Sequence, residues 1–228
     1  LQQNFGGQAV VPLSRRSDQK SQPGQEAEVA SSLARRHEVG ALINYFIDAL
    51  ETDQVDYFGS HTGAHIGVEL AILRPDRIRK IIFDGIGVFD AVMRKAMLEN
   101  YAPIMKPDEF GTQFTWAWHF LRDQMMHFPY FMRDPEHRME NDMPPAEFLH
   151  IHVTDVLKAL TTYHKGYHAV FRHDVEQRLP LVTVPSLFMS SEMDPLHKYL
   201  DDSAARVPGA GTCLITKDAG IAGQVSAI

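Results

Sequence analysis

Residues 55–64 read Val-Asp-Tyr-Phe-Gly-Ser-His-Thr-Gly-Ala, and they give the strongest indication of the fold in the sequence. Val55–Phe58 is typical of a short buried strand, and it leads through a five-residue turn with glycine at both ends, Gly59–Gly63, into a helical pattern that ends at Leu73. The central residue of such a tight turn is forced into a strained backbone conformation, and its side chain stands exposed above the sheet. The helix that follows supplies N–H groups that can stabilise an oxyanion. The central residue here is His61.

The segments on both sides of this turn continue the alternation of helix and strand. Between residues 26 and 50, hydrophobic side chains recur at helical spacing and predict an amphipathic helix. Arg79–Phe83 predicts a second short strand, and Ala9–Val11 could add one near the N-terminus. Helix, strand, helix and strand with short connections indicate parallel βαβ units. The sequence therefore predicts the α/β class, with a mostly parallel sheet flanked by helices.

The alternation stops between residues 88 and 178. Hydrophobic side chains at helical spacing predict three helices in this segment, over residues 89–101, 110–121 and 148–163. Methionine and aromatic side chains are concentrated here, and they either pack a helical layer or line a cavity for a substrate.

The βα pattern then returns. Leu181–Met189 predicts a strand, Asp194-Pro195 opens a helix, and Gly211–Thr216 predicts the last strand. A helical block between two βα stretches indicates an insertion over one end of a continuing sheet. Two parts are therefore expected, namely a core of residues 1–87 and 179–228 and a helical cap of residues 88–178.

Residues 55–87 resemble the nucleophile-elbow region of the α/β-hydrolases, most of all in the Arg74–Arg79 bridge to the next strand. Val184–Asp194 resembles the strand that presents the acidic triad member of that family. The resemblance implies a capped α/β-hydrolase, similar to esterases and epoxide hydrolases, that hydrolyses a small, largely apolar ester or related acyl compound. It also implies attack from the elbow, an oxyanion held by backbone N–H groups including that of Thr62, and Asp194 orienting a base.

The chain departs from the family pattern in three places. The pattern is Gly-x-nucleophile-x-Gly, and its centre holds His61, whereas Ser60 stands one position early. No histidine follows Thr216, although the family places its catalytic histidine after the last strand. Residues 1–25 are too short for the strands that precede the elbow in the family, so we expect an N-terminus that is truncated or altered relative to the family.

His61 and Ser60 are both candidates for the reactive group. An imidazole has a pKa near neutrality and can act as nucleophile or general base; alternatively, His61 only hydrogen-bonds neighbouring loops. Asp194 is a candidate acid and also a candidate N-cap of the next helix. Asp84, after the second strand, is the second candidate acid. The missing base could be one of four histidines of the cap, His119, His164, His168 and His173.

No metal and no cofactor are expected. His164 and His168 stand at i and i+4, a spacing that can bind a metal ion, but neither a cysteine nor a Glu-x-x-His pattern completes a site. The glycine patterns of phosphate loops and dinucleotide sites are absent, because Gly85-Ile-Gly87 lacks a third glycine at the needed spacing. The single cysteine, Cys213, is expected to be an inert thiol in a buried strand.

The composition excludes two classes of partner. With 22 basic and 29 acidic residues the formal net charge is −7, which does not favour nucleic acid. No apolar run approaches the ~18–20 residues of a membrane span, and no signal-peptide pattern is visible. A cytoplasmic protein is expected, although the chain starts at Leu1, so a leader could be missing.

Three hypotheses about function follow. The chain is either an esterase-like enzyme or a catalytically inactive homologue that binds a small apolar ligand or a partner through the cap. The atypical residues 1–25 also fit a shortened or frame-altered hydrolase. The apolar cap could bury a contact between two copies in a homodimer as well as a substrate.

Overall fold

The computed structural model of this 228-residue chain describes residues 47–49, 51–219, 222–223 and 226. The strand expected at Ala9–Val11 and most of the helix expected between residues 26 and 50 lie outside the described residues. The described residues fall into two compact units. The first unit comprises the described residues up to Gly87, Val175–Glu192 and those from Leu196 onward, and the second comprises Val88–Asp174 and Met193–Pro195.

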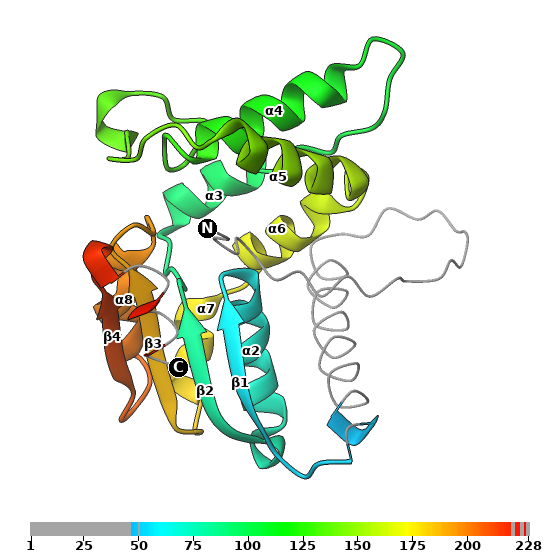
Figure 1. Ribbon diagram of the computed structural model, residues 1–228. Coiled ribbons are helices and arrows are strands. Elements are labelled where there is room, and N and C mark those ends of the chain that lie inside the picture. The colour runs from blue at the N-terminus through cyan, green and yellow to red at the C-terminus, as the bar shows by residue number, and fades with distance from the viewer. Residues whose placement is uncertain (1–46, 50, 220–221, 224–225, 227–228) are drawn as a thin grey trace. The chain divides into compact units, whose positions relative to one another are not determined.

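The first unit is built on a parallel sheet. Its described strands lie in the order β1 (Val55–Ser60), β2 (Ile78–Asp84), β3 (Ser186–Ser191) and β4 (Gly211–Ile215), and each neighbouring pair is parallel (Figure 1). This confirms the predicted α/β class with a parallel sheet flanked by helices. Because the strands are parallel, their carboxyl ends meet at one edge of the sheet.

Three helices of the first unit accompany the sheet. Helix α2 (Thr62–Leu73) packs on β1 and β2, α7 (Val175–Arg178) packs on α2, and α8 (Leu200–Ala205) packs on β3 and β4. The face of the sheet that α2 covers is apolar, with the rings of Phe83 and Phe188 4.9 Å apart. Side chains alternate between the two faces of a strand, so the residues next to Phe83 face the other side.

Two sequence predictions for the end of the chain need correction. Strand β3 begins at Ser186 and not at Leu181, because Leu179–Leu181 forms a 3-10 turn and Pro185 has no N–H for the ladder. The carbonyl of Pro185 accepts a hydrogen bond from the N–H of Ile81, so pairing starts there. Cys213 is half-buried on β4 and not in the core, since β4 is the last strand of the described sheet and is mostly exposed.

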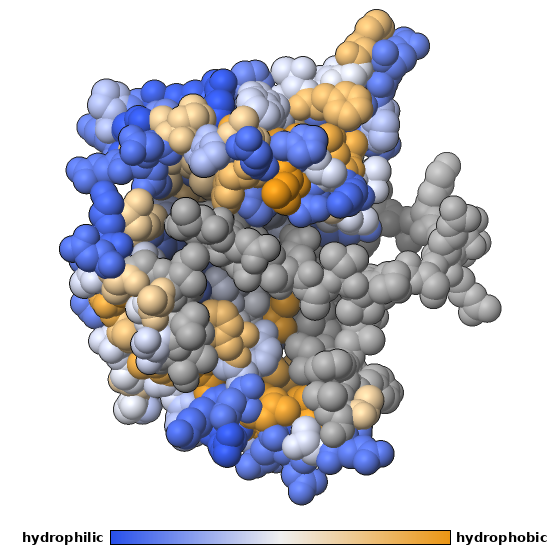
Figure 2. Space-filling view, in the orientation of Figure 1, coloured by the Kyte–Doolittle hydropathy of each residue, from blue (hydrophilic) through white to orange (hydrophobic). Residues whose placement is uncertain are grey.

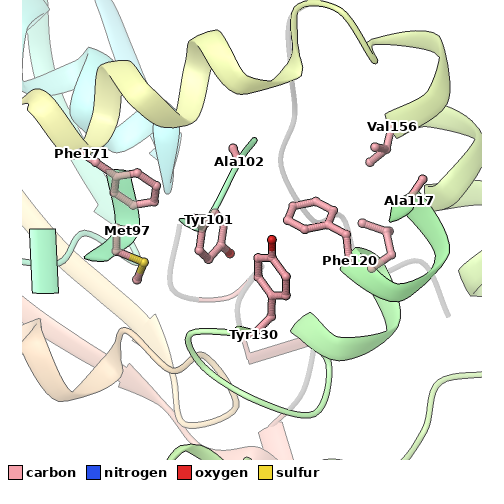
Figure 3. Close-up of a cluster of buried hydrophobic side chains, with 9 residues drawn as sticks. Met97, Tyr101, Ala102, Ala117, Phe120, Tyr130, Val156 and Phe171 are labelled. Carbon is pink, nitrogen blue, oxygen red and sulfur yellow. The ribbon is translucent and has the colours of Figure 1, made fainter. Parts of the chain in front are cut away.

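The second unit contains four described helices, α3 (Ala91–Asn100), α4 (Thr112–Gln124), α5 (Ala146–Lys158) and α6 (Tyr163–Arg172). The helix expected over residues 148–163 corresponds to α5, which ends at Lys158; a turn follows at residues 159–162, and α6, which begins at Tyr163, was not predicted. The side chains of Tyr101, Phe120 and Tyr130 converge in its core (Figure 3). The rings of Phe120 and Tyr130 meet edge to face, with centroids 4.9 Å apart. Such aromatic pairs add about 0.5–1.5 kcal/mol to the free energy gained from burial.

The two units differ from the sequence expectation at one boundary and in one short segment, because Met193–Pro195 was expected in the core and groups with the second unit. The second unit ends at Asp174, whereas the expected cap ended at residue 178, because α7 groups with the first unit. Arg178 of α7 donates two hydrogen bonds of 2.8 Å to the carboxylate of Glu69 on α2. This bidentate pair ties α7 to the first unit.

Exposed hydrophobic side chains lie just before and along α4 in the second unit. Phe110, just before the helix, is 85% exposed, and Phe114 and Trp118 are 59% and 40% exposed. Hydrophobic residues of this kind are interspersed with hydrophilic ones on the visible surface (Figure 2). Within the described residues, no helix combines the length and the apolar character that crossing a bilayer requires.

Candidate functional site

The turn between β1 and α2 holds His61 in a conformation that L-residues rarely adopt. Its φ of 48° and ψ of −106° lie outside the regions allowed for side chains with a Cβ atom. A residue held in this way costs on the order of 1–3 kcal/mol. The N–H of His61 donates to the carbonyl of Asp84 at 2.8 Å, and its carbonyl accepts from the N–H of His65 at 3.2 Å. The strand and the helix together hold the strained conformation.

Glycines and a tyrosine make this turn possible. A Cβ atom on Gly59 would overlap the carbonyl group of Gly63 and lie 2.7 Å from a ring carbon of Tyr57. The Tyr57 hydroxyl donates a hydrogen bond to the carbonyl of Gly63 at 2.9 Å. Burial raises the pKa of Tyr57 to about 12, so the hydroxyl keeps its proton near neutral pH. The turn is thus fixed by close packing and by a permanent donor.

Ser60 and Asp84 lie side by side where β1 and β2 end. They are register partners in the parallel ladder, so their side chains lie on the same face of the sheet. Asp84 is only 6% exposed. The serine therefore lies next to a buried carboxyl group, whereas the strained centre of the turn belongs to His61.

Thr62 is the first residue of α2. The first N–H groups of a helix have no acceptor within the helix, and they carry the positive end of its dipole. An anion that forms beside His61 would therefore meet the N–H groups at the start of α2.

His65 is a site residue that was not among the candidates from the sequence. It lies in the first turn of α2, and its N–H donates to the carbonyl of His61 at 3.2 Å. Helical side chains lean toward the N-terminus, which here means toward the turn between β1 and α2. His65 is 8% exposed, as is Glu69 one turn later. The signal was visible in the sequence, since the polar residues His65 and Glu69 stand four positions apart within a predominantly apolar helix.

The remaining candidates belong to the second unit. Asp194 follows β3 by three residues, in the segment Met193–Pro195 that groups with the second unit. It is not the N-cap of the next helix, because α8 begins only at Leu200, behind a 3-10 turn at His197–Tyr199. The four histidines that could replace the missing base, His119, His164, His168 and His173, also belong to the second unit.

The structure thus brings together Ser60, His61, Thr62 and Asp84 at the carboxyl edge of the sheet, with His65 on the adjoining helix face. Within the part of the chain that the structure describes, no three His, Cys, Asp or Glu side chains gather in a way that could hold a metal ion.

No protein-family model matches the chain, and no curated protein matches it. Solved structures do match. Epoxide hydrolase A from Mycobacterium thermoresistibile gives a TM-score of 0.57 at 14% identity, over 80% of this chain and 68% of that one. An esterase from Exiguobacterium antarcticum gives 0.55 at 13% identity, over 82% and 68%. The α/β-hydrolase enzyme MGS-M2, from a Medee basin deep-sea metagenome library, gives 0.54 at 17% identity, over 78% and 62%.

The chain therefore spans 62–68% of the length of these three structures. At identities of 13–17% the likeness establishes the fold and leaves the reaction open.

Proposed function

Because the chain has the α/β-hydrolase fold, we propose that it is a hydrolase whose reaction takes place at the turn between β1 and α2. The observation that carries this proposal is the strained conformation of His61 at φ 48° and ψ −106°. Strain of this kind persists where the surrounding structure over-determines it, and it is concentrated at active sites. The proposed substrate is a small, largely apolar ester or a related acyl compound.

His61 is the proposed reactive group. As a nucleophile, an imidazole nitrogen attacks the carbonyl carbon and the alcohol leaves with a proton; water then hydrolyses the acyl-imidazole, which releases the acid and restores the histidine. As a general base, the same nitrogen takes a proton from an attacking water. In both routes the carbonyl oxygen becomes an oxyanion, which the N–H of Thr62 and its neighbours at the start of α2 would stabilise.

Three side chains are proposed to support His61. His65 is the proposed proton acceptor or orienting partner, because it lies in the first turn of α2, is 8% exposed and donates its N–H to the carbonyl of His61. Asp84 is the proposed acid within the first unit, since its main-chain carbonyl accepts a hydrogen bond from the N–H of His61 and so holds the two residues close together. Asp194 keeps the role of acid that the family resemblance implies.

Ester hydrolysis by the purified chain tests the proposal, with p-nitrophenyl acetate and butyrate as substrates. His61→Ala should lower turnover by about 10²–10⁴-fold, the range expected when a general base or nucleophile is lost. His150→Ala is the matched control, because His150 is exposed on α5 of the second unit. If Ser60→Ala and not His61→Ala abolishes turnover, Ser60 and not His61 is the nucleophile.

A catalytically inactive homologue that binds a small apolar ligand is the second candidate function. It is favoured by one observation, namely that the centre of the turn holds a histidine, His61, at the position where the family pattern places its nucleophile. If the folded wild type, His61→Ala and Ser60→Ala all match background hydrolysis, this candidate replaces the first.

A further inference from the structure

We propose that His164 and His168 form a two-histidine site for a divalent transition-metal ion of the copper, nickel or zinc type. Both histidines are half-buried on α6 of the second unit, four residues apart on one helix face. Their ring centroids are 5.6 Å apart, and the ring planes make an angle of 66°. The spacing His-x-x-x-His is the one by which the helix of zinc metalloproteases presents two ligands to one ion.

The separation of the rings fits a shared ion. A metal bound to an imidazole nitrogen at about 2.0–2.1 Å lies about 3.2 Å from the ring centroid, and two such rings at a tetrahedral angle have centroids about 5.2 Å apart. The observed 5.6 Å corresponds to an angle of about 120° at the metal, so a small rotation of the rings suffices.

His164 contributes a second independent observation. Its Nδ1 atom is buried and has no hydrogen-bond partner among the described residues. Leaving a polar atom in that situation costs about 1–3 kcal/mol. An ion bound at Nδ1 itself would give this atom the partner that it lacks.

The proposed ion is held by these two rings and by water. No third His, Cys, Asp or Glu ligand joins them in the part of the chain that the structure describes. Imidazole ligands suit copper, nickel and zinc, and the usual affinity order places Cu²⁺ first. Arg172, one turn beyond His168 and exposed, repels the ion through solvent and weakens binding.

Calorimetric titration of the full chain with Cu²⁺ and with Zn²⁺ tests the site. The wild type should bind one ion that His164→Ala and His168→Ala each weaken by at least about 10–100-fold, the loss typical of altered metal surroundings. His150→Ala, at an exposed position of α5, should keep the wild-type affinity. Arg172→Gln should tighten binding a few-fold, because it removes the nearby positive charge.

Two further measurements keep the test decisive if an alanine variant folds poorly. His168→Asn keeps a polar side chain at this position, and its circular dichroism reports whether the unit is folded. Electron paramagnetic resonance of the Cu²⁺ complex should show two nitrogen ligands in the wild type and fewer in the variants. Equal affinity in the wild type, His164→Ala and His168→Ala, or an effect of only one of the two alanine variants, would overturn the proposal. None of these readouts depends on ester hydrolysis.

Discussion

Replacing His61 by glycine should leave the first unit more stable than replacing it by alanine. Both changes remove the imidazole, so the comparison isolates the backbone. Alanine keeps a Cβ atom at φ 48° and ψ −106°, whereas glycine has no Cβ and adopts this conformation without strain.

The expected difference follows from two opposing terms. Relief of the strained conformation is worth about 1–3 kcal/mol. Glycine loses about 0.4–1 kcal/mol relative to alanine, because its unfolded chain has more freedom. At the midpoints of the two ranges the balance favours glycine by about 1.3 kcal/mol, which corresponds to about 3–5 °C in melting temperature for a protein of this size.

Thermal unfolding followed by far-ultraviolet circular dichroism measures this difference. The matched control is the pair Asp201→Gly and Asp201→Ala, because Asp201 is exposed on α8 of the same unit. There the order should be the ordinary one, with alanine more stable by about 0.5–1 kcal/mol. If His61→Ala melts at or above the temperature of His61→Gly, the turn stores no strain, and the observation that carries the proposed active site fails.

Three further predictions concern the first unit, and the first of them has a control in the second unit. In denaturant titrations Gly67→Ala should destabilise the first unit by about 1–3 kcal/mol, because the new Cβ would lie 2.7 Å from the ring of Tyr57. The control Gly166→Ala on α6 meets nothing within 4 Å and should stabilise that helix by about 0.8–1 kcal/mol. Because burial raises the pKa of Tyr57 to about 12 in the folded chain, the stability that its protonated hydroxyl contributes is complete below pH 10 and is lost as the pH rises toward 12. In unfolding curves at pH 9 and pH 12, Tyr57→Phe should therefore lose about 2 kcal/mol less stability between the two pH values than the wild type. Equal losses in the two proteins would refute this. Arg178→Met should cost about 3 kcal/mol, since it removes both guanidinium hydrogen bonds from the carboxylate of buried Glu69, and Glu69→Gln in the same chain should recover part of the loss.

The sequence predicted the elements whose boundaries carry local signals. Glycines at positions 59 and 63 and the Arg74-Pro75 pair mark the ends of β1 and α2, so both elements were found within two residues. The break between α5 and α6 has no such mark. It is a turn in which the N–H of Tyr163 and the Thr162 hydroxyl both bond to the carbonyl of Ala159, at 2.7 and 3.1 Å. Packing of Tyr163 and Tyr167 against the aromatic core decides where α6 begins, and that packing is not local.

The site was predictable in part for the same reason. The glycine spacing identified His61 as the centre of the turn, and the structure gives it the positive φ that this geometry requires. The neighbourhood of Ser60 and Asp84 depends on the register between β1 and β2, which the residues between them in the sequence do not reveal. Asp194 groups with the second unit through contacts with residues far away in sequence, so its place could not be inferred from its position after β3.

Both tryptophans of the chain, Trp116 and Trp118, lie on α4. Trp116 is stacked on Phe120 with centroids 5.1 Å apart, whereas Trp118 is 40% exposed. Intrinsic tryptophan emission therefore comes from the second unit, whereas the sheet next to His61 contains no tryptophan. A shift of the emission maximum that precedes or follows the loss of ellipticity would show the two units unfolding as separate cooperative blocks.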